Sequence, residues 1–421
     1  MNAAEKKVAA AERPVPNPQG SFLGPFRYRD FTLLWSGLFV GNIGTWIQFT
    51  ALGYYVAKLA PNVGIGSFYI GLLGASRMIP VLIASPFAGV VADRYPRRPI
   101  LLSTNIMTAI LAVLLSTALF THTASLPVIL IISAFQAATQ SFDAPARQSW
   151  VPLLVPRELI GNAIGLNSFG FNAPSVVGPP IAGILINSFG VAPCMSLNAI
   201  VKFAVVIAII FMKPSPASSK ARTSFGSAII EGIRFIYGHS VLRWIYLMLI
   251  VTALSVRSYS FLLPAYAVHV LHTDAGGLSG LMAATGIGAV GGALLIAAVN
   301  VKRRAVIWFV SGLMASLGVS ALGVTDSYVL AAIVLTFVGL GTQSFAGSSN
   351  VLVQMLAPDD MRGRAISVYS MVLLGLVPGG ALVIGTIARF SDLRMVFVWS
   401  GLLCACMGIW TFCAHPKLRA S

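Results

Sequence analysis

Twelve long apolar segments divide most of this chain. A helix of about 20 residues crosses the hydrocarbon core of a bilayer, and only helices and closed barrels satisfy every backbone group there. The segments are expected at 31–57, 69–92, 98–120, 126–147, 162–187, 191–212, 243–268, 278–300, 304–324, 328–348, 365–388 and 394–414. We therefore expect an all-α membrane protein with twelve transmembrane helices in two six-helix bundles.

The composition supports placement in a membrane. Hydrophobic residues make up 57% of the 421 residues and charged residues only 10%, whereas soluble domains carry about 25% charged residues. A net charge of +16 on a soluble surface would suggest nucleic acid, but here the charges gather between membrane spans, so we expect a lipid bilayer and no nucleic-acid partner. Residues 1–29 are polar and basic, which favours a cytoplasmic tail over a cleaved leader.

The distribution of basic residues predicts the topology. With the amino terminus inside, 22 of the 28 Lys and Arg residues lie in inner segments, three in outer loops and three within spans. Basic residues favour the cytoplasmic side of a membrane. We therefore expect a multi-pass protein of the bacterial plasma (inner) membrane with both termini in the cytoplasm.

The longest internal loop separates two similar halves. Gln140-Ser141-Phe142 recurs as Gln343-Ser344-Phe345, and Pro156 and Gly178 match Pro358 and Gly380 at an offset of 202. Six spans per half predict parallel repeats related by a pseudo-two-fold axis along the membrane normal. The expected parts are a tail at 1–29, a six-helix bundle at 30–212, a cytoplasmic linker at 213–242, a second bundle at 243–414 and a tail at 415–421.

The linker contains a predicted amphipathic helix. Phe225, Ile229, Ile233 and Ile236 fall on one helical face, and Glu231 and Arg234 fall on the other. This pattern is typical of a helix that lies on the inner membrane surface.

A dense polar turn, Gly-Val-Val-Ala-Asp-Arg-Tyr-Pro-Arg-Arg, occupies residues 89–98 between the second and third spans. With twelve spans, this Gly-x-x-x-Asp-Arg-x-x-Arg-Arg pattern resembles the signature of the major facilitator superfamily. The segments 75–80, 142–148, 167–179 and 231–235 are similar to its transmembrane-secretion-effector and enterobactin-exporter-like branch, which includes macrolide and siderophore exporters. Pro96 stands where the signature usually has Gly, and Ser175 stands where the branch often has Arg.

The resemblance implies that the signature turn is a conformational latch. Asp93 would accept hydrogen bonds from the start of the eleventh span, near Ala365, and Arg97 would pair with Asp143 at the end of the fourth span. Such contacts would hold the halves together on the cytoplasmic side and favour an outward-facing state. The predicted latch consists of Gly89, Asp93, Arg94, Arg97, Arg98, Asp143 and Arg147. The alternative is that the arginines only set the topology.

Three basic residues, Arg77, Lys202 and Arg257, lie within spans, whereas no Asp or Glu lies deep in any span. Charges at this depth are costly and usually face a water-filled cavity. The three cations therefore predict a substrate that carries carboxylate, phosphate or catecholate groups. The alternative is that each side chain bonds helix carbonyls or extends toward the interface.

Uncharged polar side chains complete the predicted substrate site. They are Asn42 and Gln48 in the first span, Gln136 and Gln140 in the fourth, Asn167 in the fifth and Gln343 in the tenth. These groups either line a cavity or form hydrogen bonds that hold the helices together.

Other function classes find little support. The chain has no phosphate-binding Gly-x-x-x-x-Gly-Lys-Ser/Thr loop, so we expect secondary transport rather than a nucleotide-driven pump. The four cysteines lie in or beside apolar spans, and His269 and His272 are the only closely spaced histidines. We expect neither an enzyme nor a bound metal or cofactor.

The sequence therefore predicts a monomeric exporter of a small organic compound, working by alternating access. An importer or lipid flippase of the same fold, or a membrane receptor that does not transport, is the alternative. Proton coupling through Asp30 or Asp143, coupling through the substrate's own protonation, and no coupling all stay open, as do the identity of the substrate and the direction of transport.

Overall fold

The computed structural model describes residues 22–213, 225–298 and 304–415, without the side chains at positions 86, 89, 90, 93, 225–229, 297, 359, 360 and 374. This described part is helical and contains no strand. Its first half comprises η2 (Gly24–Arg27), α2 (Arg29–Lys58), α3 (Val63–Arg94), α4 (Arg97–Phe120), α5 (Leu126–Trp150), η3 (Val151–Leu153), η4 (Arg157–Leu159), α6 (Ile160–Asn172), α7 (Pro174–Phe189) and α8 (Ala192–Ile210).

The linker helix α9 (Phe225–Gly238) precedes the second half. That half comprises α10 (Leu242–Ser255), α11 (Tyr259–His269), α12 (Ala275–Ala298), α13 (Arg304–Gly323), α14 (Tyr328–Leu356), α15 (Asp359–Met371), the π-helical turn η6 (Val372–Leu376), α16 (Val377–Phe390) and α17 (Leu393–Ala414). Ten helical segments of the described residues are long and apolar enough to cross a membrane, and Val377–Phe390 is a shorter apolar helix. With the 30-residue α2, they are consistent with twelve spans.

Three of the predicted spans are discontinuous. The segment 162–187 is α6 and α7 joined at Ala173, 243–268 is α10 and α11 joined at 256–258, and 365–388 is α15, η6 and α16. Pro174 lies at the start of α7, where its missing N–H costs no helical hydrogen bond. At the second break, the Ser258 hydroxyl donates to the carbonyls of Ala253 and Val377 at 2.7 and 2.8 Å. The apolar pattern predicted these spans but not the interruptions.

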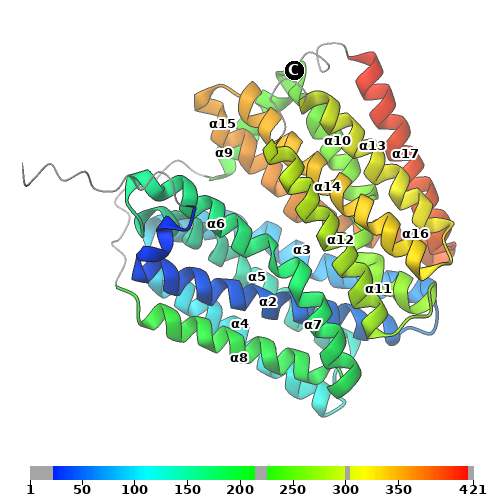
Figure 1. Cartoon of the computed structure of the whole chain (residues 1–421), viewed down its shortest axis with the longest axis horizontal. Coiled ribbons are helices and arrows are strands. Elements are labelled where there is room, and N and C mark those ends of the chain that lie inside the picture. Colours follow the sequence, from blue (N-terminus) through cyan, green and yellow to red (C-terminus); the bar gives the residue numbers. More distant parts are fainter. Residues whose placement is uncertain (1–21, 214–224, 299–303, 416–421) are drawn as a thin grey trace, which may run out of the picture.

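The helices form two bundles that share one seam. Figure 1 shows α2 to α8 in one group and α10 to α17 in the other. Within the first bundle α3 packs on α5, and α4 packs on α8; within the second, α14 packs on α12 and α13. Between the bundles, the principal contacts are α3 with α16 and α7 with α12. The two bundles therefore come from successive parts of the chain.

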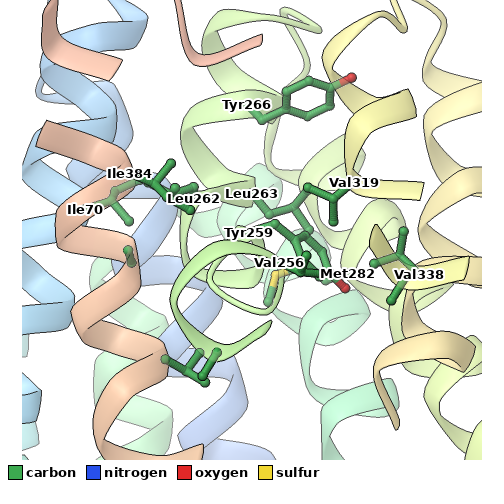
Figure 2. Packing of buried hydrophobic residues seen from close by; sticks show 14 of the residues in the cluster. Ile70, Val256, Tyr259, Leu262, Leu263, Tyr266, Met282, Val319, Val338 and Ile384 are labelled. Carbon is green, nitrogen blue, oxygen red and sulfur yellow. The ribbon is translucent and has the colours of Figure 1, made fainter. Parts of the chain in front are cut away.

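The hydrophobic core is divided unequally between the two ends of the molecule. One buried cluster extends across both halves, and Figure 2 shows Ile70 of α3 beside Ile384 of α16 and Leu262 of α11. A second cluster, which includes Phe31, Leu101 and Trp150, contains residues of the first half alone. The halves thus share a core at one end, whereas at the other end the first half has a core of its own.

Candidate functional site

Close backbone contact closes the end at which the halves share their core. We call this the sealed end, and it consists of 63–78 of α3 with 378–390 of α16, and 183–187 of α7 with 274–279 of α12. Glycines allow this approach. A Cβ on Gly71 would lie 2.8 Å from the carbonyl oxygen of Ala381, and a Cβ on Gly64 would lie 2.9 Å from that of Ala388. On the α7 side, a Cβ on Gly183 would meet the hydroxyl of Ser279 at 2.5 Å. Larger side chains are therefore excluded at these three positions of the seam.

Hydrogen bonds of His269 and Asn187 join the halves at the sealed end. His269 of α11 donates from Nε2 to the carbonyl oxygen of Ala57, at 2.8 Å. Asn187 of α7 donates to the carboxylate of Asp274 at 2.7 Å, and the other oxygen of Asp274 accepts from the Gly277 amide at 2.8 Å. The Gly277 amide, and after it the Asn187 amide, hold the pKa of Asp274 below its usual range. Asp274 therefore stays ionised at neutral pH.

The halves separate toward the opposite end, which we call the basic end (residues 94–98 of the signature turn and the start of α15). In the first part of α3, Ser67 and Ile70 are buried under α16, whereas Ile83 and Phe87 further along the helix are each 63% exposed. The second core cluster at this end includes no residue of the second half. The conformation is thus closed at the sealed end and not joined by a shared core at the basic end.

The signature turn lies at the basic end. Arg94 is exposed, Arg97 donates from Nε to the Ser149 hydroxyl at 3.4 Å, and Arg98 donates to the carbonyls of Ile209 and Ile210 at 3.2 and 2.5 Å. Arg98 therefore caps the end of α8, where the helix dipole favours a cation. Gly89 and Asp93 lie on α3, but the Asp93 side chain is outside the described residues, so its role in the latch stays a prediction.

The helix start that was predicted near Ala365 is wrong by two turns. The helix α15 begins at Asp359, and Ala365 is a buried residue whose carbonyl accepts from the Tyr246 hydroxyl at 2.6 Å. The apolar pattern placed the start too late because the first two turns of α15 are polar. Close to this start, Arg364 forms an ion pair of 2.8 Å with Glu231 of α9. The predicted linker helix is thus present and is tied to α15.

The remaining latch residues form a network inside the first half. Arg147 of α5 pairs with Asp143 at 3.2 Å, one turn earlier on the same helix. Its Nη1 also donates to Asn167 of α6 at 3.0 Å, and Asn105 of α4 donates to Asp143 at 3.3 Å. Arg147 and Asn167 line a crevice of about 290 Å³, including open solvent, with Trp35, Phe39 and the predicted Asn42. Asn42 donates to the Gly170 carbonyl at 3.2 Å.

Arg77 lies on α3, and Arg257 lies between α10 and α11; all three of these helices pack on α16. A Cβ on Gly379 would meet the Met78 sulfur at 2.8 Å, and Gly380 lies against Ser258, so the neighbours of both arginines touch the same turn of α16. The Arg77 guanidinium lies 5.9 Å from the Phe49 ring, which packs edge-on against Phe261 at 5.4 Å. These aromatic contacts join α2 and α3 of the first half to α11 of the second.

Arg257 occupies the break between α10 and α11 and donates to the Thr342 carbonyl of α14 at 3.2 Å. Neither Arg257 nor Arg77 has a carboxylate partner among the described residues. Discontinuous helices form the substrate sites of many transporters, because their free backbone groups and helix ends face a cavity. This arrangement provides positive charge and aromatic surface beside the seam between the halves.

The other predicted substrate residues fall into two groups. Gln48 and Gln136 are buried and joined by a 2.7 Å hydrogen bond, and Asn198 of α8 donates to Gln48. This contact holds α2, α5 and α8 together. In contrast, Gln140 and Gln343, which occupy equivalent positions of the two repeats, are half-buried and have no hydrogen-bond partner in the described part of the chain.

Lys202, the third predicted cation, lies on α8 and is buried against α2, with 8% of its surface exposed. It interacts electrostatically with Asp143 and Arg147 of α5. Sequence analysis missed Asn198, which lies one turn before Lys202, and it missed the bonds that close the sealed end. Asn198 has a signal in the sequence, since it is a polar residue inside an apolar span. The bonds of Asn187 and His269 have none, because their partners are distant in the chain.

The fold and this site define a membrane transporter built from two helical repeats. A family model described as transmembrane secretion effector matches residues 20–420. The chain therefore belongs to this family of major facilitator superfamily transporters, which are not enzymes. Its resemblance to that superfamily is confirmed.

Individual relatives agree with this assignment, and a solved structure agrees with the fold. The staphyloferrin A transporter of Staphylococcus aureus is 25% identical over 91% of this chain and 96% of its own length. The multidrug efflux pump Tap of Mycobacterium tuberculosis is 26% identical, over 90% of this chain and 91% of its own. The structure of a point mutant of the nucleoside transporter NupG has a TM-score of 0.72 at 14% identity, covering 91% of this chain and 100% of its own.

Proposed function

We propose that this protein exports a small organic anion across the bacterial plasma membrane by alternating access. The observation that carries the proposal is Arg257. It lies in a helix break beside the seam, bonds one backbone carbonyl and has no carboxylate partner in the described residues. With Arg77 nearby on α3, the site holds positive charge that a carboxylate, phosphate or catecholate would neutralise. Half-buried Gln140 and Gln343 would supply further hydrogen bonds.

The proposed orientation places the sealed end outside. The excess of basic residues at the other end favours the cytoplasm there, with both termini inside. The halves at 30–212 and 243–414 would then be open to the cytoplasm in this conformation, as needed to receive an exported substrate. In this topology the latch of Asp93 and its neighbours would close the basic end in the opposite, outward-facing state.

The relatives support a transporter of small molecules, and their names suggest siderophore-like or drug-like substrates. One is named as a transporter of staphyloferrin A, and the other as a multidrug efflux pump. We propose that the protein works as a monomer, because each half supplies one side of the substrate site. An importer or flippase would use the same fold, and the direction of transport separates these alternatives.

Accumulation in cells tests the proposal. We expect a deletion strain to accumulate anionic probes, such as carboxyfluorescein and carboxylate or catecholate siderophores, more than the same strain re-expressing the gene. The cationic dye ethidium serves as the matched probe of opposite charge. Equal accumulation of every anion in the two strains would contradict the proposed substrate class. Lower accumulation in the deletion strain would instead indicate import.

A further inference from the structure

A column of polar residues runs through the first half from mid-depth to the basic end. Gln136, Gln140, Asp143 and Arg147 follow one another at intervals of three or four residues along α5, so they share a helical face. Gln48 of α2, and Asn198 and Lys202 of α8, complete the column.

The mid-depth part of the column contains buried polar atoms without hydrogen-bond partners in the described structure. Gln136 Nε2, Asn198 Oδ1 and the hydroxyl of Ser133, one turn before Gln136, have no hydrogen-bond partner in the described structure. All three residues are at most 3% exposed. Buried groups of this kind ordinarily bind ordered water, which makes two to four hydrogen bonds at such sites. The column can therefore bind water between its mid-depth end and Lys202.

Lys202 lies between these amides and the ion pair at the basic end. A Cβ on Gly41 would lie 3.7 Å from Lys202 Nζ, so the glycine leaves room for the amine against α2. Within the described residues, Nζ has no hydrogen-bond acceptor, and its charged neighbours are Asp143 and Arg147. The low exposure of Lys202 is unusual for a lysine, because an ammonium group is strongly solvated in water.

Among the described residues, the other helices that pack on α8 place no competing charge beside Lys202. The arginine of α4 nearest to α8, Arg98, bonds carbonyls two turns further along α8. Asp30 of α2 accepts from the Lys213 amide at the end of the chain segment that follows α8. The helix α7 contains no charged residue. Burial is therefore the main influence on the proton occupancy of Lys202, and Asp143 and Arg147 are the charged groups that act on it.

We propose that Lys202 is the proton carrier that couples transport to the proton gradient, an inference that rests on the proposed transport function. The neutral amine takes up one proton from the outside to become an ammonium group, and it releases that proton to the cytoplasm past Asp143. The ammonium form attracts Asp143 and repels Arg147, whereas the amine does neither. Arg147 bonds Asn167 of α6, and α6 leads into α7 at the seam with α12. Protonation of Lys202 thereby changes the relative stability of the two conformations.

A pair of spin labels tests this proposal without any substrate. Gly161 and Gly363 are equivalent positions of the two repeats at the basic end, and a Cβ added at either would meet no atom within 4 Å. We would place Gly161→Cys and Gly363→Cys in a Cys406→Ser, Cys413→Ser background, because the other two cysteines are buried. In reconstituted full-length protein, the label distance distribution is measured from about pH 5 to about pH 10, a range that covers ordinary lysine titration.

With Lys202 native, we expect the distance distribution to shift with pH. Lys202→Arg, always charged, and Lys202→Met, always neutral, should each lose this shift and resemble the acidic and alkaline forms respectively. Lys58→Arg, which changes the last residue of α2, is the matched control and should keep the pH-dependent shift. A shift that persists in Lys202→Arg, or that is absent in the parent protein, would overturn the proposal. If Lys202→Met does not fold, Lys202→Arg, which keeps a long aliphatic stem, still decides the question.

The two proposals fail separately in this design. If the parent protein did not export anions but its label distances still responded to pH through Lys202, only the proposed substrate class would be contradicted. Anion export that is unaffected by a proton gradient, together with an unchanged pH response in Lys202→Arg, would contradict only the role of Lys202.

Discussion

Replacing Gly71 with leucine is expected to lower the transport rate about five- to 150-fold, because overpacking a close helix contact costs about 1–3 kcal/mol. A Cβ at this position would lie 2.8 Å from the carbonyl oxygen of Ala381 and 2.9 Å from the Cα of Leu382. These are backbone atoms, so no side-chain rotation relieves the clash. The contact joins α3 to α16 in the sealed conformation. The substitution therefore destabilises that conformation, and the transporter no longer returns readily to the state that is closed at the sealed end.

Gly161→Leu is the matched control for Gly71→Leu. A Cβ at Gly161 meets nothing within 4 Å, so the same change of side chain should leave transport close to the parent rate. Both variants are compared in the rate of anion efflux at equal amounts of protein in the membrane. A Gly71→Leu variant that transports like the parent protein would contradict the view that the seam opens and closes during transport.

Replacing Arg257 with alanine is expected to reduce transport of anions about tenfold to 150-fold, since a hydrogen bond to a charged group contributes about 1.5–3 kcal/mol. Arg257 supplies positive charge in a helix break where, among the described residues, no carboxylate neutralises it. An anion that binds there loses its main electrostatic partner in the variant. Arg257→Lys keeps the charge without the planar donor geometry and should retain part of the activity.

Arg394→Ala provides the comparison for Arg257→Ala. Arg394 is also an arginine of the second half, but its side chain pairs with Asp326 at a loop outside the site. Its removal should leave the concentration dependence of anion transport unchanged. The measurement is the initial efflux rate of carboxyfluorescein over a range of concentrations, with ethidium as the cationic reference. If Arg257→Ala recognises anions as well as the parent does, the assigned binding role is wrong.

The sequence predicted the features that depend on hydrophobicity and charge along the chain. The apolar segments, the linker helix and the repeat were visible because each has a period or a composition of its own. The breaks at Ala173 and at 256–258 were not visible, because broken and continuous membrane helices have the same apolar composition. The start of α15 at Asp359 was placed too late for a related reason: its first turns are polar although they are helical.

The site was predictable only in part, because side-chain partners depend on the packing of distant segments. The sequence identified Arg77, Lys202 and Arg257 as cations in apolar surroundings, but it did not show that their environments differ. Lys202 lies beside an ion pair inside one bundle, whereas Arg77 lies over the Phe49 ring near the seam. Gln48 and Gln136 had two readings, and the structure joins them to each other rather than leaving them open to a cavity. Which polar groups pair depends on how distant segments pack in the folded protein.

The measurement that tests the central claim most directly is transport of carboxyfluorescein and labelled carboxylate siderophores into membrane vesicles of both orientations. For an exporter with its basic end in the cytoplasm, we predict uptake of at least one of these anions into inverted vesicles that contain the parent protein. Uptake should fall in those containing Arg257→Ala. Uptake in right-side-out vesicles alone, or transport of ethidium without any anion, would contradict the account.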